Sequence, residues 1–150
     1  MKKVVTVTLG SSKQDFEFKT QFLGQSFSVR RMGADQDTGK AWELMRRQQA
    51  TADAIGLGEI PDHYQVGVRT VINKETERLT NVVTRVPVTT GATLRRMLQV
   101  RAVRFVQKEL GNYFNNNLVL FLSGMRNYDM AVAMSDYTKN LSFADAVFQT

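Results

Sequence analysis

Short apolar stretches alternate with helix-like segments along almost the whole chain, and this alternation limits the fold more than any other feature. Five of the stretches lack the apolar–polar alternation of a half-exposed sheet, which indicates strands buried on both faces. They are Val4–Leu9, Ala54–Leu57, Val86–Thr89, Leu118–Leu122 and Ala144–Phe148. Ser26–Arg31 is a further, more exposed candidate strand.

The segments between these stretches have apolar residues at a period near 3.6 and start signals that are typical of helices. We expect helices over Asp37/Thr38 to about Gln49, Asn73 to Val83, Thr90–Thr93 to Gly111, and Asn127 to Tyr137. Strand, helix and strand in succession are typical of right-handed crossovers between parallel strands. The sequence therefore predicts an α/β fold with a mainly parallel sheet of about five to six strands and helices on both faces, a three-layer arrangement of Rossmann-like or flavodoxin-like type.

Residues 14–31 allow two interpretations. Phe16, Phe18 and Phe22 alternate loosely with polar residues, and Gly24 is a typical turn residue. The segment forms either an edge hairpin or a helix followed by the strand Ser26–Arg31.

Composition excludes several kinds of site. The 150 residues include no cysteine and one histidine, so cysteine nucleophiles, disulfides, thiolate zinc sites and multi-histidine metal sites are excluded. We predict no metal site and a cytoplasmic location. No apolar run approaches the roughly 20 residues that cross a bilayer, so we expect no membrane segment. Without repeats or linkers, we expect one α/β domain over residues 1–150, either alone or as the amino-terminal part of a longer two-domain protein.

Ligands of open parallel sheets bind beyond the carboxyl ends of the strands. The loops Gly10–Lys13 and Thr89–Thr93 follow predicted strands, and the second opens the longest predicted helix. Backbone amides, hydroxyls and cations of such loops can bind an anion, although an ordinary turn and a helix cap explain the same residues. Our predicted ligand contacts are Ser11, Ser12, Lys13, Thr90, Gly91, Thr93 and Arg95.

The sequence offers binding groups rather than a catalytic centre. Gly56-Leu57-Gly58 lacks the third glycine and the helix of a dinucleotide fingerprint. We identify no nucleophile with a partnered base. From this chain alone we therefore expect ligand binding and orientation, not catalysis.

Charge and aromatic residues suggest two other functions. The net charge is +6, and five cations of the 93–110 segment, Arg95, Arg96, Arg101, Arg104 and Lys108, accompany the single acid Glu109. This basic helix could contact the phosphate backbone of a nucleic acid, although Phe105 is expected in the core, so no exposed aromatic residue is interleaved with the cations for base stacking. Alternatively, the chain is a self-assembling interaction module, a homo-oligomer formed through Phe16, Phe18 and Phe22 or through Tyr113 and Phe114.

Several motifs occur in the order found in a known family. They are Val4–Lys13, Gly33–Asp35, Asp53–Gly58, Thr90–Leu94 and the tail Asn140–Phe148. In these motifs the chain resembles the amino-terminal domain of quinate 5-dehydrogenase-like (shikimate/quinate dehydrogenase-like) proteins. The resemblance implies the small anionic or polyol ligand-binding domain of an NAD(P)-dependent dehydrogenase, with the cofactor bound by a downstream Rossmann domain that this chain lacks. Asn81–Arg85 is only superficially similar to the catalytic motif of shikimate-type enzymes, so no catalytic residue follows from the resemblance.

Overall fold

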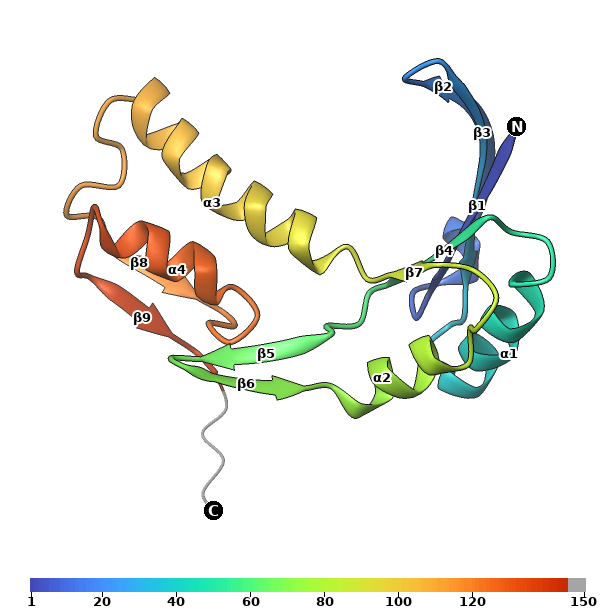
Figure 1. Cartoon of the computed structure of the whole chain (residues 1–150). Helices are drawn as coiled ribbons and strands as arrows, with labels where there is room; N and C mark the ends of the chain where they lie inside the picture. The colour runs from blue at the N-terminus through green and yellow to red at the C-terminus, as the bar shows by residue number, and fades with distance from the viewer. Residues whose placement is uncertain (146–150) are drawn as a thin grey trace. The chain divides into compact units, whose positions relative to one another are not determined.

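The computed structural model describes residues 1–145, which divide into two compact units. Unit 1 comprises Met1–Asp62 and Ile72–Gly91. Unit 2 comprises His63–Val71 and the chain from Ala92 onward. The chain therefore passes from unit 1 into unit 2 at His63, returns to unit 1 at Ile72, and enters unit 2 again at Ala92 (Figure 1).

Unit 1 is built on a five-stranded sheet with the order β2-β3-β1-β4-β7. The strands are β1 (Lys2–Thr8), β2 (Phe16–Phe22), β3 (Gln25–Gly33), β4 (Ala54–Gly58) and β7 (Val88–Thr89). Neighbours β3, β1, β4 and β7 run parallel, whereas β2 runs antiparallel to β3. The sheet is therefore mixed.

The hairpin β2–β3 resolves the alternatives for residues 14–31 in favour of an edge hairpin. A short 3-10 helix, Ser12–Gln14, leads from β1 into β2. The two turn residues, Leu23 and Gly24, have φ values of 48° and 77°. Positive φ at both central positions is the requirement of the two-residue turn that matches the twist of antiparallel strands.

Two helices, α1 (Thr38–Gln48) and α2 (Lys74–Asn81), pack on the sheet of unit 1. Asp37, not Thr38, caps α1 by accepting a hydrogen bond from the Lys40 amide, and Asn73 caps α2. Both helices contribute to one buried cluster, which joins their apolar side chains to those of β1 and β4. Its largest fully buried members are Val7, Met45, Ile55, Leu57 and Leu79.

The predicted parallel sheet with helices on both faces is wrong. In unit 1 the chain passes from β1 to β3 through a hairpin, so no crossover helix forms at this step to cover the second face. That face carries Phe18 and Val29, which are register partners, and Val4 beside them. The other two helices of the described chain belong to unit 2.

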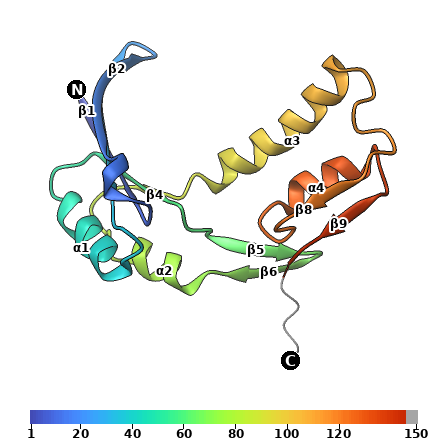
Figure 2. The same cartoon turned by 180° about the vertical axis from the view of Figure 1, so that it is seen from behind.

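Unit 2 contains two small sheets and two helices. β5 (His63–Val66) and β6 (Arg69–Ile72) pair with each other, and their hairpin was not predicted from the sequence. β8 (Val119–Phe121) and β9 (Leu141–Phe143) are parallel and are joined through α4 (Tyr128–Ser135). α3 (Ala92–Glu109) packs along α4, as both views show (Figures 1 and 2). The core of the unit is Val103, Phe121, Ala131, Ala133 and Met134.

Most predicted elements are confirmed with small shifts at their ends, including all four helices. The last strand is an exception, because β9 spans Leu141–Phe143 instead of the predicted 144–148. Residues 146–148 of that prediction lie outside the described residues. In the described chain, no helix has both the length and the apolar character needed to span a membrane.

Candidate functional site

The carboxyl ends of three parallel strands of unit 1 meet at one edge of its sheet. Thr8 of β1 is in register with Gly33 of β3 on one side and with Gly58 of β4 on the other. The loops that follow therefore start side by side. We call this the carboxyl edge of unit 1.

Backbone contacts hold these loops together at the carboxyl edge. The Asp35 amide donates to the Gly10 carbonyl at 2.9 Å. A Cβ at Gly33 would lie only 2.5 Å from the Ser11 carbonyl, and a Cβ at Gly10 would collide with the Glu59 carboxylate. Glycine is required at Gly33 because the backbone of the loop after β1 approaches so closely, whereas at Gly10 the flexible Glu59 side chain would have to move.

Arg31 is the central cation of this edge. Its Nη1 donates to the Ser11 carbonyl at 2.9 Å and lies 3.2 Å from Asp15 Oδ1. Its Nη2 lies 3.0 Å from Glu59 Oε1. The side chain is only 11% exposed, so its two carboxylate partners are needed to balance the partly buried charge. Arg31 thus ties the loops after β1 and β4 to the end of β3.

Two carboxylates bind backbone amides in the same place. Asp15 Oδ1 accepts from the Gly33 amide at 2.6 Å, and Asp35 Oδ1 accepts from the Ser12 amide at 2.7 Å. The ion pair and hydrogen bond with Lys40, followed by the bond from Ser12, hold the pKa of Asp35 well below its usual range. The Ser12 amide, which the sequence offered as an anion ligand, is therefore bound to a carboxylate of the same chain.

The backbone is strained at the carboxyl edge. Asp35, Gln36 and Glu59 have φ values of 55°, 66° and 60°. Residues other than glycine adopt this left-handed region at a cost, and such strain is concentrated at functional sites.

A cavity of about 420 Å³ lies further along the same edge, beside β7. Its walls come from the loop after β4, from α2 and from the end of β7. They are formed by Asp62, Ile72, Thr76, Glu77, Thr80, Val88, Thr89 and Thr90. Four hydroxyl groups and two carboxylates thus surround a space large enough for a small ligand.

Hydrogen bonds fix several hydroxyls of this cavity. The Thr76 hydroxyl donates to the Pro61 carbonyl at 2.7 Å, and the Thr80 hydroxyl donates to the Thr76 carbonyl at 3.0 Å. The Thr89 hydroxyl accepts from the Gly91 amide at 3.1 Å. The cavity wall is therefore rigidly positioned by the backbone around it.

The predicted ligand contacts fall into three places. Ser11, Ser12 and Lys13 lie together in the loop after β1, at the Arg31 cluster. Thr90 lines the cavity beside β7 and Gly91 follows it with a φ of 69°. Thr93 and Arg95 are exposed residues of α3 in unit 2. Their roles in ligand binding stay predictions.

Sequence reasoning missed the residues that organise the edge, namely Arg31, Asp15, Glu59 and the α2 residues Thr76, Glu77 and Thr80. No clear local signal marks Arg31, because its strand was predicted as a more exposed one and a charged residue is ordinary there. No local signal marks Glu59 or Glu77. Their positions depend on how the strands are ordered.

The glycines Gly56 and Gly58 do not lie in a turn of the kind that binds a dinucleotide. Gly56 and Gly58 lie within β4, where their missing side chains make room for Thr6 and Thr8 of β1. The space beside Gly10, where a phosphate would approach, holds the Glu59 carboxylate. Within residues 1–145 no group of three or more His, Asp or Glu side chains could hold a metal ion.

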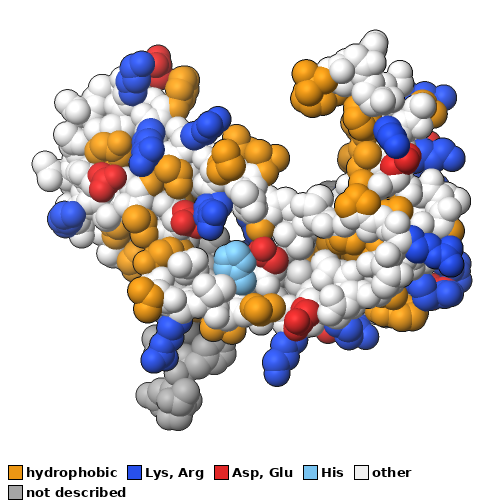
Figure 3. Space-filling model, in the orientation of Figure 1, with side chains coloured by type: hydrophobic (Ala, Val, Ile, Leu, Met, Phe, Trp, Pro, Cys, Tyr) orange, Lys and Arg blue, Asp and Glu red, His pale blue; other side chains and the backbone are white. Residues whose placement is uncertain are grey.

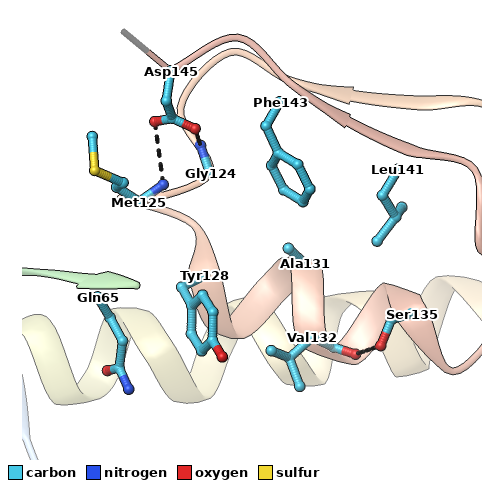
Figure 4. A pocket seen from close by; sticks show the side chains of 10 residues that line it. All are labelled: Gln65, Gly124, Met125, Tyr128, Ala131, Val132, Ser135, Leu141, Phe143 and Asp145. Atoms are coloured by element: carbon cyan, nitrogen blue, oxygen red, sulfur yellow. Dashed lines mark hydrogen bonds between the residues drawn. The ribbon is translucent and has the colours of Figure 1, made fainter. Parts of the chain in front are cut away.

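Unit 2 has a separate pocket of about 350 Å³ between α4 and β9. Figure 4 shows Phe143 and Leu141 of β9 facing Ala131 of α4, and Val132 also lines the pocket, so its walls are mainly apolar.

At one end of this pocket, Asp145 accepts hydrogen bonds from the Gly124 amide at 2.7 Å and the Met125 amide at 3.3 Å (Figure 4). Partial burial tends to raise the pKa of Asp145, but these bonds and one from Ser123 outweigh it and lower that pKa. As at the carboxyl edge of unit 1, a carboxylate of the chain itself occupies the amides of a loop after a strand.

The comparisons with known proteins divide the chain near the boundary between the units. A family described as a domain of unknown function (DUF8753) matches residues 3–90, which are more than half of the 150. The chain belongs to this family. A second family, described as a domain of unknown function (DUF8754), matches residues 93–150. No curated protein matches the chain.

Proposed function

We propose that unit 1 binds a small polyol in the cavity beside β7. The observation that carries this proposal is a hydroxyl- and carboxylate-lined hollow of about 420 Å³ at the carboxyl edge of the sheet. Open α/β sheets bind their ligands beyond the carboxyl ends of the strands, and small-molecule sites are typically about 300–1,000 Å³.

The chemistry of the wall favours hydroxyl groups over anions. The Glu77 carboxylate can accept hydrogen bonds from ligand hydroxyls, and threonine hydroxyls can donate or accept them. Glu77 and Asp62 also repel a negative charge placed between them. Of the anionic and polyol ligands expected from the sequence, the polyol is therefore the better match.

We further propose that the chain is the ligand-binding part of a dehydrogenase-like protein and acts in the cytoplasm. The support for the first point is the resemblance to quinate 5-dehydrogenase-like proteins, and for the second the absence of cysteine. In this proposal NAD(P) is bound by another domain, as the resemblance implies, which is supported by the position of Gly56 and Gly58 within β4 instead of in a glycine-rich turn. The chain's own task is to bind and orient the polyol.

Isothermal titration calorimetry tests the proposal with quinate, shikimate, inositol and inorganic phosphate as probes. We expect inositol, which carries no charge, to bind with one molecule per chain, and the anions quinate, shikimate and phosphate to bind more weakly because Glu77 and Asp62 repel them. Glu77→Gln removes the acceptor charge and should weaken polyol binding about tenfold, the loss of one hydrogen bond to a charged group.

Glu75→Gln is the matched control, because it makes the same change on the same helix, outside the cavity wall. Equal effects of the two substitutions would overturn the assignment of the cavity. If none of the polyols binds to the folded chain, the proposed function itself is wrong.

A second candidate function rests on α3. Its arginines Arg95, Arg101 and Arg104 are exposed, so the helix can meet a phosphate backbone. Binding of a short duplex would then weaken steeply with salt, and Arg101→Ala would reduce the slope of log K against log salt by about one. Salt-independent or undetectable binding would exclude this function.

A further inference from the structure

β2 is an exposed edge strand of unusual regularity. It ends the strand order of the unit 1 sheet, and all seven of its residues pair with β3 without a bulge. It contains no proline. Proteins protect such edges with prolines, bulges, very short strands or charged side chains, because an unpaired edge can add another strand. Of these devices β2 has only the charged pair Glu17 and Lys19, whose opposite signs can complement those of a second copy.

The two faces of β2 differ sharply. Phe16, Phe18 and Phe22 lie on one face with exposed fractions of 49%, 48% and 65%, while Glu17 and Lys19 lie on the other. Figure 3 shows hydrophobic side chains along one side of the hairpin and charged ones along the other. An apolar row of this kind on an open edge favours association.

We propose that β2 pairs with β2 of a second copy of this chain, antiparallel and centred on Phe18. In this register Phe18 lies opposite its counterpart, and Glu17 of each copy lies opposite Lys19 of the other. The resulting sheet has five strands from each copy. Because the contact is symmetric and uses the same edge twice, it closes at two copies.

Charge selects this register over its neighbour. A pairing centred on Lys19 would place the two Lys19 ammonium groups opposite each other, which is destabilising in a sheet. The pairing centred on Phe18 instead makes two Glu17–Lys19 pairs. Among the described residues Glu17 makes only long contacts, 3.3 Å to the Ser28 hydroxyl and 3.9 Å to Arg30, so its carboxylate can also meet a cation from the second copy.

Sedimentation velocity over micromolar concentrations tests the pairing. We expect the mass to rise from 17.0 kDa toward twice that value as the concentration increases. Lys19→Glu and Glu17→Lys each place like charges opposite each other, so each variant should dissociate at least tenfold more readily. Lys74→Glu, at the start of α2, makes the same change of charge away from this edge and should leave the dimer intact.

Mixing the two variants provides the decisive measurement. In a mixed pair the lysines of the Glu17→Lys chain meet the glutamates of the Lys19→Glu chain, so the dimer should return. Circular dichroism confirms that each variant is folded before mixing. A wild-type chain that stays monomeric, assembles beyond two copies, or dimerises equally well with either variant would overturn the proposal. Two folded, monomeric variants that fail to associate on mixing would overturn the register.

Discussion

Within residues 1–145, unit 1 buries twelve apolar side chains in its core cluster, whereas unit 2 buries five. The sheet of unit 1 has five strands, and the sheets of unit 2 have two each. A larger core buries more apolar surface per residue and tolerates more unfavourable local structure. We therefore expect unfavourable backbone conformations to be tolerated in unit 1 more than in unit 2.

Backbone strain follows the same division. In unit 1 the residues other than glycine with positive φ are Leu23, Asp35, Gln36 and Glu59, whereas in the described part of unit 2 they are Asn112 and Asn116. Asparagine adopts this conformation at little cost, and leucine, glutamine and glutamate do not. Unit 1 therefore carries strained turns that its core can offset, and unit 2 uses residues that avoid the strain.

Matched methionine substitutions give the largest expected effect on this comparison. Met45 of α1 is fully buried in the unit 1 core, and Met134 of α4 is 9% exposed in the unit 2 core. Met→Ala in a core costs about 2–5 kcal/mol. We expect Met45→Ala to fall near the upper end and Met134→Ala near the lower end, because the smaller core can relax around the cavity.

Hydrogen exchange resolved by peptide measures the two losses, since it reports each unit separately. Met45→Ala should raise exchange in unit 1, and Met134→Ala in unit 2. Uniform loss of protection over both units in either variant would show that they unfold as one, and the comparison would then fail.

Substitution of Arg31 measures how much the stability of the carboxyl edge depends on this one cation. Arg31→Met keeps the length of the side chain but leaves Asp15 and Glu59 without their shared partner. Removing one member of a buried ion pair costs about 3–5 kcal/mol, and because these carboxylates are about half exposed we expect roughly 2–3 kcal/mol.

Arg78→Met on α2 is the control, since its ion pair with Glu75 lies on the surface and should contribute less than about 1 kcal/mol. Urea denaturation compares the two variants. Equal losses would mean that the Arg31 cluster is no stronger than a surface ion pair.

Patterns local to the sequence predicted the helices and most strands, because caps and apolar periodicity are set by neighbouring residues. Asp37 and Asn73 lie at helix starts for this reason. Strand order was not predictable in this way, because it depends on pairing between strands that are distant in sequence. The hairpin β5–β6 was not predicted, because it lies within a stretch without clear periodicity.

The candidate site was predictable only in part, for the same reason. Loop residues such as Lys13 and Thr90 could be found because they follow recognisable strands. Arg31 and Glu77 could not, because their partners and cavity are distant in sequence and meet only through the order β3-β1-β4-β7.

Exchanging residues between two turns tests the strain comparison at a smaller scale. Leu23 is 90% exposed in the hairpin turn, so Leu23→Asn should stabilise unit 1 by about 1 kcal/mol through relief of positive φ. Asn116→Leu should destabilise unit 2 by a similar amount. Thermal unfolding measures both changes, and a loss of stability in Leu23→Asn would contradict the argument from strain.

The smallest expected effect concerns the pH dependence of α1 in unit 1 compared with α3 in unit 2. In α1, hydrogen bonds from Arg46 and then Arg47 lower the pKa of Glu43 to about 2 from 4.5. The folded state thus holds this proton less tightly than the unfolded state, so the contribution of Glu43 is complete above pH 4.5 and is lost as the pH falls toward 2. The pair is exposed, so the loss is small and decreases with salt.

Hydrogen exchange of α1 amides at pH 6 and pH 3 in low salt should show this loss. Glu43→Gln should reduce the difference between the two pH values in α1 and leave α3 of unit 2 unchanged. A pH response of α1 that persists in full in Glu43→Gln would assign it to other carboxylates of unit 1, such as Asp35 and Asp53, whose pKa values are also lowered.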